Sequence, residues 1–197
     1  MARERVVILG GYGNTGRAVA RLMLEHSRAD LVLAGRDRAK AAWFADELNR
    51  SFSGDRVRGV EADAARADSL RPVLEGASIV VAASSTAVHT ATVTQATLDA
   101  GADYMDPQYS TRKLETLRSF EPAIAAAGRC FVTDGGFHPG LPAALVRYAA
   151  SRLENIRRAR VASVIQIDWK GLEISPATLE EMAMEFSDYQ SLHYRAG

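Results

Sequence analysis

The chain has 197 residues, of which 47% are hydrophobic and 24% charged, and its 24 basic residues balance its 24 acidic residues. This length favours one domain or two small ones, and a net charge of zero gives no overall field that would attract nucleic acid or an anionic membrane surface. No apolar run approaches the roughly 18 residues needed to span a bilayer or forms a signal-peptide core, so we expect a cytoplasmic protein with neither a membrane nor a nucleic acid as partner.

Short β-branched runs alternate with stretches of helical period over the first part of the chain. The runs are typical of buried parallel strands and lie at residues 6–9, 31–34, 57–60, 79–83, 104–105 and 130–133. Apolar spacings of three and four residues predict helices between them, around residues 19–23, 41–48, 70–74, 93–100 and 114–124. Strands that alternate with helices predict an α/β fold, a Rossmann-type doubly wound parallel sheet.

The pattern changes at Pro142, which suits the first turn of a helix that apolar residues continue as far as Leu153. An alternating run at 161–169 then indicates an antiparallel strand, and a capping box at Thr178 predicts a last helix. One strand and one helix cannot form a core alone. We therefore expect a Rossmann domain at residues 1–140 and, at 141–197, a linking helix and the start of a second α+β domain for substrate binding or dimerisation. Packing of this tail on the first domain, or on a second subunit, is the alternative.

A glycine-rich turn follows the first predicted strand. Gly11, Gly13 and Gly16 match the pattern G-x-G-x-x-G. The first glycine permits a tight turn, the second lets the backbone approach a pyrophosphate, and the third lets the helix pack closely on the strand. The helix that begins here offers free N–H groups and a positive dipole end to phosphates. We expect a dinucleotide to bind at this turn; a glycine-rich turn that binds nothing is the alternative.

The end of the second predicted strand distinguishes NADP from NAD. An NAD site usually carries an acid there, which holds the ribose 2′-hydroxyl. In this chain Gly35 leaves space at that position, and the guanidinium of Arg36 can bind a 2′-phosphate, with Arg38 and Lys40 adding positive charge. These residues favour NADP. Asp37 could serve as the acid in a shifted register, or could cap the helix that follows.

Residues after the third and fourth strands complete the expected cofactor site. The small residues and hydroxyls after the fourth strand fit a close approach to the ribose, and Asp63 can border the adenine; turn chemistry alone is the alternative for the serines. The expected cofactor-binding residues are Gly11, Tyr12, Gly13, Asn14, Thr15, Gly16, Arg36, Asp63, Ala83, Ser84 and Ser85.

Polar residues also follow the later strands, on the side where ligands of such sheets bind. Asp106 and His138 are the expected substrate-side residues, with Tyr109 close to the first of them. Histidine titrates near neutral pH and suits proton transfer, whereas turn or capping roles are the alternative for both residues. The histidines lack metal-ligand spacing, and the single cysteine, Cys130, is expected to be a small buried hydrophobe. No metal site is predicted.

Segments at residues 10–16, 34–36, 101–106 and 136–140 together resemble the saccharopine dehydrogenase (reductase) family, and the resemblance spans roughly residues 5–170. It implies an N-terminal domain that binds NAD(P), followed by a mixed α/β domain that binds a small-molecule substrate and forms a homodimer. It also implies hydride transfer at an amine or imine carbon of an amino-acid-like substrate. His138 stands where the family usually has an acid.

The leading expectation is therefore an NADP-dependent oxidoreductase of this type, or the cofactor-binding part of one. A non-catalytic NADP-binding module, which senses redox state or acts as a scaffold, is the alternative from another functional class. NAD is the less favoured cofactor.

Overall fold

The computed structural model describes residues 3–137, 140–162, 164, 166, 171, 179–180, 183 and 187. The predicted strand at 161–169 and the predicted last helix therefore lie for the most part outside the described residues, as does His138. The chain divides into two compact units, Met1–Leu141 and Pro142–Gly197. A substrate-binding or dimerising role for the second unit stays a prediction.

The first unit contains a six-stranded parallel sheet in the order β3-β2-β1-β4-β5-β6. The strands are β1 (Arg5–Leu9), β2 (Asp30–Gly35), β3 (Val57–Glu61), β4 (Ile79–Ala82), β5 (Asp103–Met105) and β6 (Phe131–Val132). This arrangement confirms the predicted Rossmann-type fold. The order in which strands are added reverses between the neighbours β1 and β4, and ligands of open parallel sheets bind at such a point, outside the carboxyl ends of the strands.

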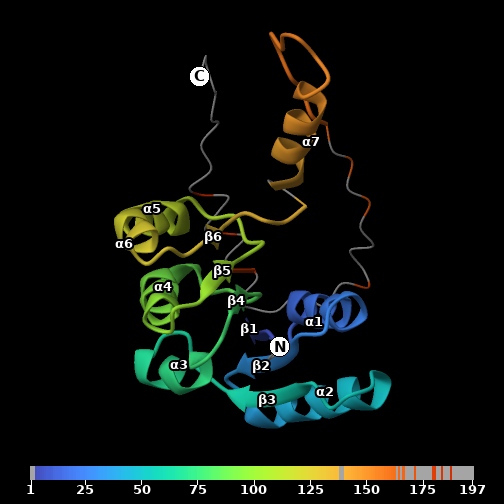
Figure 1. Cartoon of the computed structure of the whole chain (residues 1–197), viewed down its shortest axis with the longest axis vertical. Helices are drawn as coiled ribbons and strands as arrows, with labels where there is room; N and C mark the ends of the chain where they lie inside the picture. Colours follow the sequence, from blue (N-terminus) through green and yellow to red (C-terminus); the bar gives the residue numbers. More distant parts are fainter. Residues whose placement is uncertain are drawn as a thin grey trace. The chain divides into compact units, whose positions relative to one another are not determined.

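Helices cover both faces of this sheet, and Figure 1 shows them on either side of the strands. One face packs against α1 (Asn14–His26) and α2 (Arg38–Ser51). The other packs against α3 (Ala67–Leu74), α4 (Thr90–Asp99) and α5 (Thr111–Ser119). The chain also contains η1 (Ala87–His89), α6 (Glu121–Ala126) and α7 (Gly140–Ala150).

The alternation of side chains along β1 explains how one strand serves two cores. Val6 and Ile8 are buried in the core beneath α1 and α2, whereas Val7 and Leu9 are buried in the core beneath α3 and α4. Successive side chains of a strand point to opposite faces, so a strand covered on both sides reads as a continuous apolar run.

Three details differ from the sequence prediction. The single helix expected at 114–124 is two helices, because Pro122 lies in the first turn of α6, where its missing N–H costs nothing, and a new helix begins. Helix α7 ends at Ala150, before Leu153. Cys130 is exposed rather than buried, because it precedes β6, a two-residue strand at the edge of the sheet.

Gly59 allows α2 to pack closely on β3. A Cβ at this position would lie 2.2 Å from the carbonyl carbon of Ala41 and 2.3 Å from the nitrogen of Ala42. Because both are backbone atoms of α2, the helix would have to move away from the sheet to admit a side chain. We expect Gly59→Ala to lower the free energy of unfolding in a urea titration by about 2 kcal/mol. Arg58→Ala, at an exposed neighbour, is the control and should cost less than about 0.5 kcal/mol; equal losses would contradict the packing role of Gly59.

Candidate functional site

The turn after β1 is built from glycines that leave no room for side chains. Gly10 has φ +79°, and its N–H donates to the carbonyl of Ala34 over 2.7 Å, while the N–H of Gly13 donates to the carbonyl of Gly10 over 2.9 Å. A Cβ on Gly11 would lie 2.8 Å from the backbone of β2, and one on Gly16 would lie 2.2 Å from the oxygen of Gly10. The turn therefore holds α1 directly against the ends of β1 and β2.

Helix α1 begins at Asn14 with an open N-terminus. Gly13 is its N-cap residue, and no side chain of the described residues caps the first N–H groups. Asn14 and Thr15 are exposed, so this first turn faces solvent. The aligned peptide dipoles make the N-terminus of such a helix partly positive, and its free N–H groups can bind phosphate oxygens. The chemistry at this turn suits a pyrophosphate.

The loops after β3 and β4 end at the same edge of the sheet. A Cβ on Gly10 would lie 2.4 Å from the Cβ of Ser84, so the loop after β4 contacts the glycine-rich turn. The N–H of Ala83 donates to the carbonyl of Leu9, the last residue of β1, over 2.9 Å. The half-buried residues here are Ser84, Ser85 and Asp63. The carboxylate of Asp63 accepts the N–H of Ala65 over 3.0 Å. Gly10 is a site residue that was not predicted from the sequence, and its left-handed backbone makes this contact possible.

The space beside Gly35 is filled, contrary to the sequence-based expectation. A Cβ on Gly35 would lie 2.5 Å from Cε1 of the Tyr12 ring. The Tyr12 hydroxyl accepts a hydrogen bond from the N–H of Asp37 over 2.9 Å. The Asp37 carboxylate in turn accepts the N–H of Lys40 over 3.0 Å as the N-cap of α2, and this hydrogen bond holds the pKa of Asp37 below its usual value. Of the two roles considered for Asp37, the structure shows the helix cap.

Arg36 is exposed at this edge, and its guanidinium has no hydrogen bond or ion pair within the part of the chain that the structure describes. Lys40, by contrast, lies 3.5 Å from the carboxylate of Asp37 and is partly neutralised. A guanidinium presents a planar set of donors that matches phosphate oxygens. With no acid at the end of β2, the site suits a phosphate monoester better than a ribose hydroxyl.

The ends of β5 and β6 hold a buried charged cluster. Asp106 follows β5 and is fully buried, and Lys113, with a side chain 1% exposed, donates to its carboxylate over 2.5 Å. The same ammonium donates to the carbonyl of Gln108 and to the carboxylate of Asp134 at 3.2 Å. Thr133 donates its hydroxyl to Asp106 over 3.1 Å. These contacts join the loop after β5 to the turn after β6.

The two residues expected on the substrate side have different outcomes. Asp106 lies after β5 as predicted, but its carboxylate is enclosed by protein donors rather than exposed to a ligand. Burial, with the charge of Asp106 nearby, raises the pKa of Tyr104 well above its usual range, so this phenol stays neutral. His138 lies outside the described residues, and Tyr109 is half-buried in the loop after β5. Substrate contact by any of them stays a prediction.

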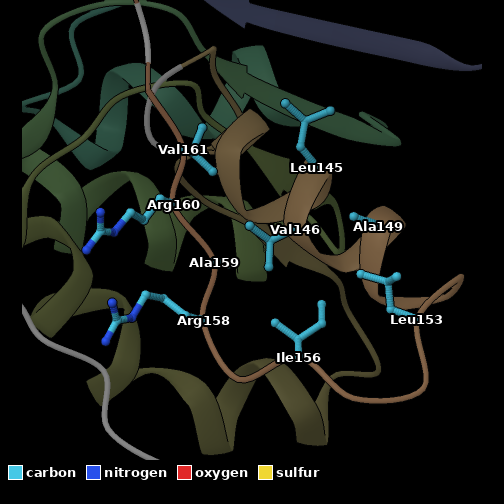
Figure 2. Close-up of a pocket in the computed structure, with 9 residues that line it drawn as sticks. All are labelled: Leu145, Val146, Ala149, Leu153, Ile156, Arg158, Ala159, Arg160 and Val161. Carbon is cyan, nitrogen blue, oxygen red and sulfur yellow. The ribbon is translucent and has the colours of Figure 1, made fainter.

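A hollow in the second unit has a different chemistry. It has a volume of about 390 Å³ and is lined by Leu145, Val146, Ala149, Leu153, Ile156, Arg158, Ala159, Arg160 and Val161. Figure 2 shows the aliphatic side chains gathered along α7 and the segment after it, with the two arginine side chains pointing away from the helix. None of the expected cofactor residues lines it.

No group of three or more His, Cys, Asp and Glu side chains is placed to bind a metal ion among the described residues. Nor does any helix in this part of the chain have the length and hydrophobicity needed to cross a bilayer.

Comparison with known proteins identifies a family and similar folds. The family model for the saccharopine dehydrogenase NADP binding domain matches residues 6–132. The structure is similar to apo saccharopine dehydrogenase (L-Glu forming) from Saccharomyces cerevisiae, with a TM-score of 0.63 and 19% identity over 75% of this chain and 31% of that one. The chain therefore spans about a third of the yeast enzyme's length. A search of curated proteins found no match.

Two further solved structures share the fold. Pen from Bacillus thuringiensis matches with a TM-score of 0.54 and 15% identity over 66% of this chain and 50% of that one. Triphenylmethane reductase from Citrobacter sp. matches with a TM-score of 0.50 and 20% identity over 66% of this chain and 47% of that one. At these identities the likeness concerns the fold alone.

Proposed function

Because the chain belongs to the saccharopine dehydrogenase NADP-binding domain family, we propose that it binds NADP at the carboxyl edge of its sheet, as the cofactor-binding part of an oxidoreductase. The observation that carries the choice of cofactor is the end of β2, where the guanidinium of Arg36 has no partner among the described residues and the Asp37 carboxylate is used as a helix cap. An NAD site would instead need a carboxylate free to accept the ribose 2′-hydroxyl.

Each element of the edge has a part in this proposal. The N–H groups at the start of α1 bind the pyrophosphate, and Arg36 binds the 2′-phosphate. Asp63 borders the adenine, and Ser84 and Ser85 hydrogen-bond the ribose on the nicotinamide side. The bound nicotinamide supplies or accepts the hydride, and the protein orients it.

The proposed substrate is an amino-acid-like molecule whose amine or imine carbon exchanges that hydride. This part rests on the family to which the chain belongs. Since Asp106 is buried and paired with Lys113, we assign it to positioning the adjoining loops rather than to substrate contact. A homodimer and a cytoplasmic location belong to the same proposal; light scattering of the purified chain tests the first.

A turnover assay tests the oxidoreductase assignment. The protein is mixed with NADP⁺ and single L-amino acids, and in the reverse direction with NADPH, a 2-oxo acid and an amine, while NADPH absorbance is followed. Turnover with any member of the panel supports the proposal. Tight NADPH binding with no turnover in either direction would limit this chain to cofactor binding, either as one part of an enzyme or as a non-catalytic sensor or scaffold.

A further inference from the structure

Tyr12 links the glycine-rich turn to the end of β2. Its ring lies so close to Gly35 that a Cβ there would be 2.5 Å from Cε1 and 2.8 Å from the hydroxyl oxygen. The ring therefore covers the end of β2, which is the place where an NAD site keeps its acid. Any larger residue than glycine at position 35 would displace the ring.

Contacts at both ends fix the orientation of Tyr12. Arg17, on α1, donates from Nε to the carbonyl of Tyr12 over 2.8 Å, and its guanidinium lies 4.6 Å from the centre of the Phe44 ring of α2. At the other end, the hydroxyl of Tyr12 accepts the N–H of Asp37 over 2.9 Å. A side chain held in this way loses little conformational entropy when a ligand binds to it.

The hydroxyl of Tyr12 still has a hydrogen-bond donor to offer. A phenol has one O–H donor in addition to its acceptor lone pairs. Asp37 occupies an acceptor site, and no acceptor for the O–H is found among the residues that the structure describes. Arg36 lies between Gly35 and Asp37 in the chain and also has an unpaired donor group. Two free donors at one strand end match an anionic group that only accepts hydrogen bonds.

We infer that Tyr12 determines cofactor specificity, because its O–H donates to the 2′-phosphate of NADP while its ring excludes the acid arrangement of an NAD site. This inference rests on the proposed function, and it adds to Arg36 a second, neutral contact to the same phosphate. A hydrogen bond to a charged group contributes more than one between neutral groups, so the contact favours a phosphate over the ribose hydroxyl of NAD.

Calorimetric titration of Tyr12→Phe with NADPH and with NADH tests the inference. The variant keeps the ring over Gly35 but removes the O–H. We expect the Kd for NADPH to rise about tenfold and the Kd for NADH to change little. Tyr148→Phe, at an exposed tyrosine of α7, is the matched control and should leave both values unchanged. If the ratio of the two Kd values is unchanged in Tyr12→Phe, whether both cofactors lose affinity equally or neither does, the inference is overturned.

A second variant keeps the test decisive if Tyr12→Phe is poorly folded. Gly35→Ala retains the hydroxyl but displaces the ring, so it should also reduce the preference for NADPH, and adding Tyr12→Phe to it should cause little further loss. Independent, additive losses would overturn the inference. Failure of the unmodified protein to prefer NADPH is a separate result, which refutes the proposed function itself.

Discussion

Replacing Lys113 with methionine is expected to lower the free energy of unfolding by about 3–5 kcal/mol, the largest loss of stability we expect from a single substitution in this chain. Lys113 and Asp106 have side chains that are each 1% exposed, and their charged atoms are 2.5 Å apart. Methionine has a similar length but no charge, so the Asp106 carboxylate would remain buried with only neutral donors around it. A loss of this size is a large fraction of the 5–15 kcal/mol typical of a folded protein.

Urea denaturation of three variants separates charge pairing from packing. Lys40→Met is the matched control, because that lysine is 71% exposed in its side chain and its ion pair with Asp37 is a surface pair worth little. The double variant Lys113→Met/Asp106→Leu removes both buried charges and should recover part of the lost stability. Equal, small losses for Lys113→Met and Lys40→Met would show that the cluster contributes nothing to stability.

Arg36→Asp is expected to raise the Kd for NADPH about a hundredfold while changing the Kd for NADH much less. The substitution replaces an exposed guanidinium with a carboxylate at the end of β2. The carboxylate repels a 2′-phosphate, whereas it can accept a hydrogen bond from the 2′-hydroxyl of NAD. Because Arg36 is exposed, the preference of the unmodified protein for NADPH should also weaken as salt concentration rises.

Arg50→Asp is the matched control for net charge. Arg50 is an exposed residue in the last turn of α2, the end of the helix remote from Arg36, so it changes the charge by the same amount without touching the site. An equal loss of affinity for NADPH and NADH in Arg36→Asp would contradict the assignment of Arg36 to the 2′-phosphate.

The strands and the glycine-rich turn were predictable because local chemistry dictates them. β-branched runs covered on both faces leave a continuous apolar signal, and a turn that brings a helix onto a strand needs glycine where Gly11 and Gly16 stand. The division of one expected helix into α5 and α6 was within reach of the sequence as well, since Pro122 is a signal for a helix start.

The features that could not be predicted depend on contacts between distant segments. A lysine within a helical pattern is normally exposed, and Lys113 is buried only because the loop after β5 and the turn after β6 enclose it. The sequence indicated open space at Gly35, whereas Tyr12, from a different turn, lies there. Gly59 gave a weak signal, because a glycine within a strand can mark a close approach of another backbone.

Calorimetric titration of the unmodified chain with NADPH and with NADH is the most direct test of the proposed site. The exposed Arg36, the helix-capping Asp37 and the Tyr12 hydroxyl all lie at the end of β2. Together they predict that NADPH binds at least about tenfold more tightly than NADH. Equal affinities for the two cofactors, or no binding of NADPH, would contradict the assignment of this edge of the sheet to NADP.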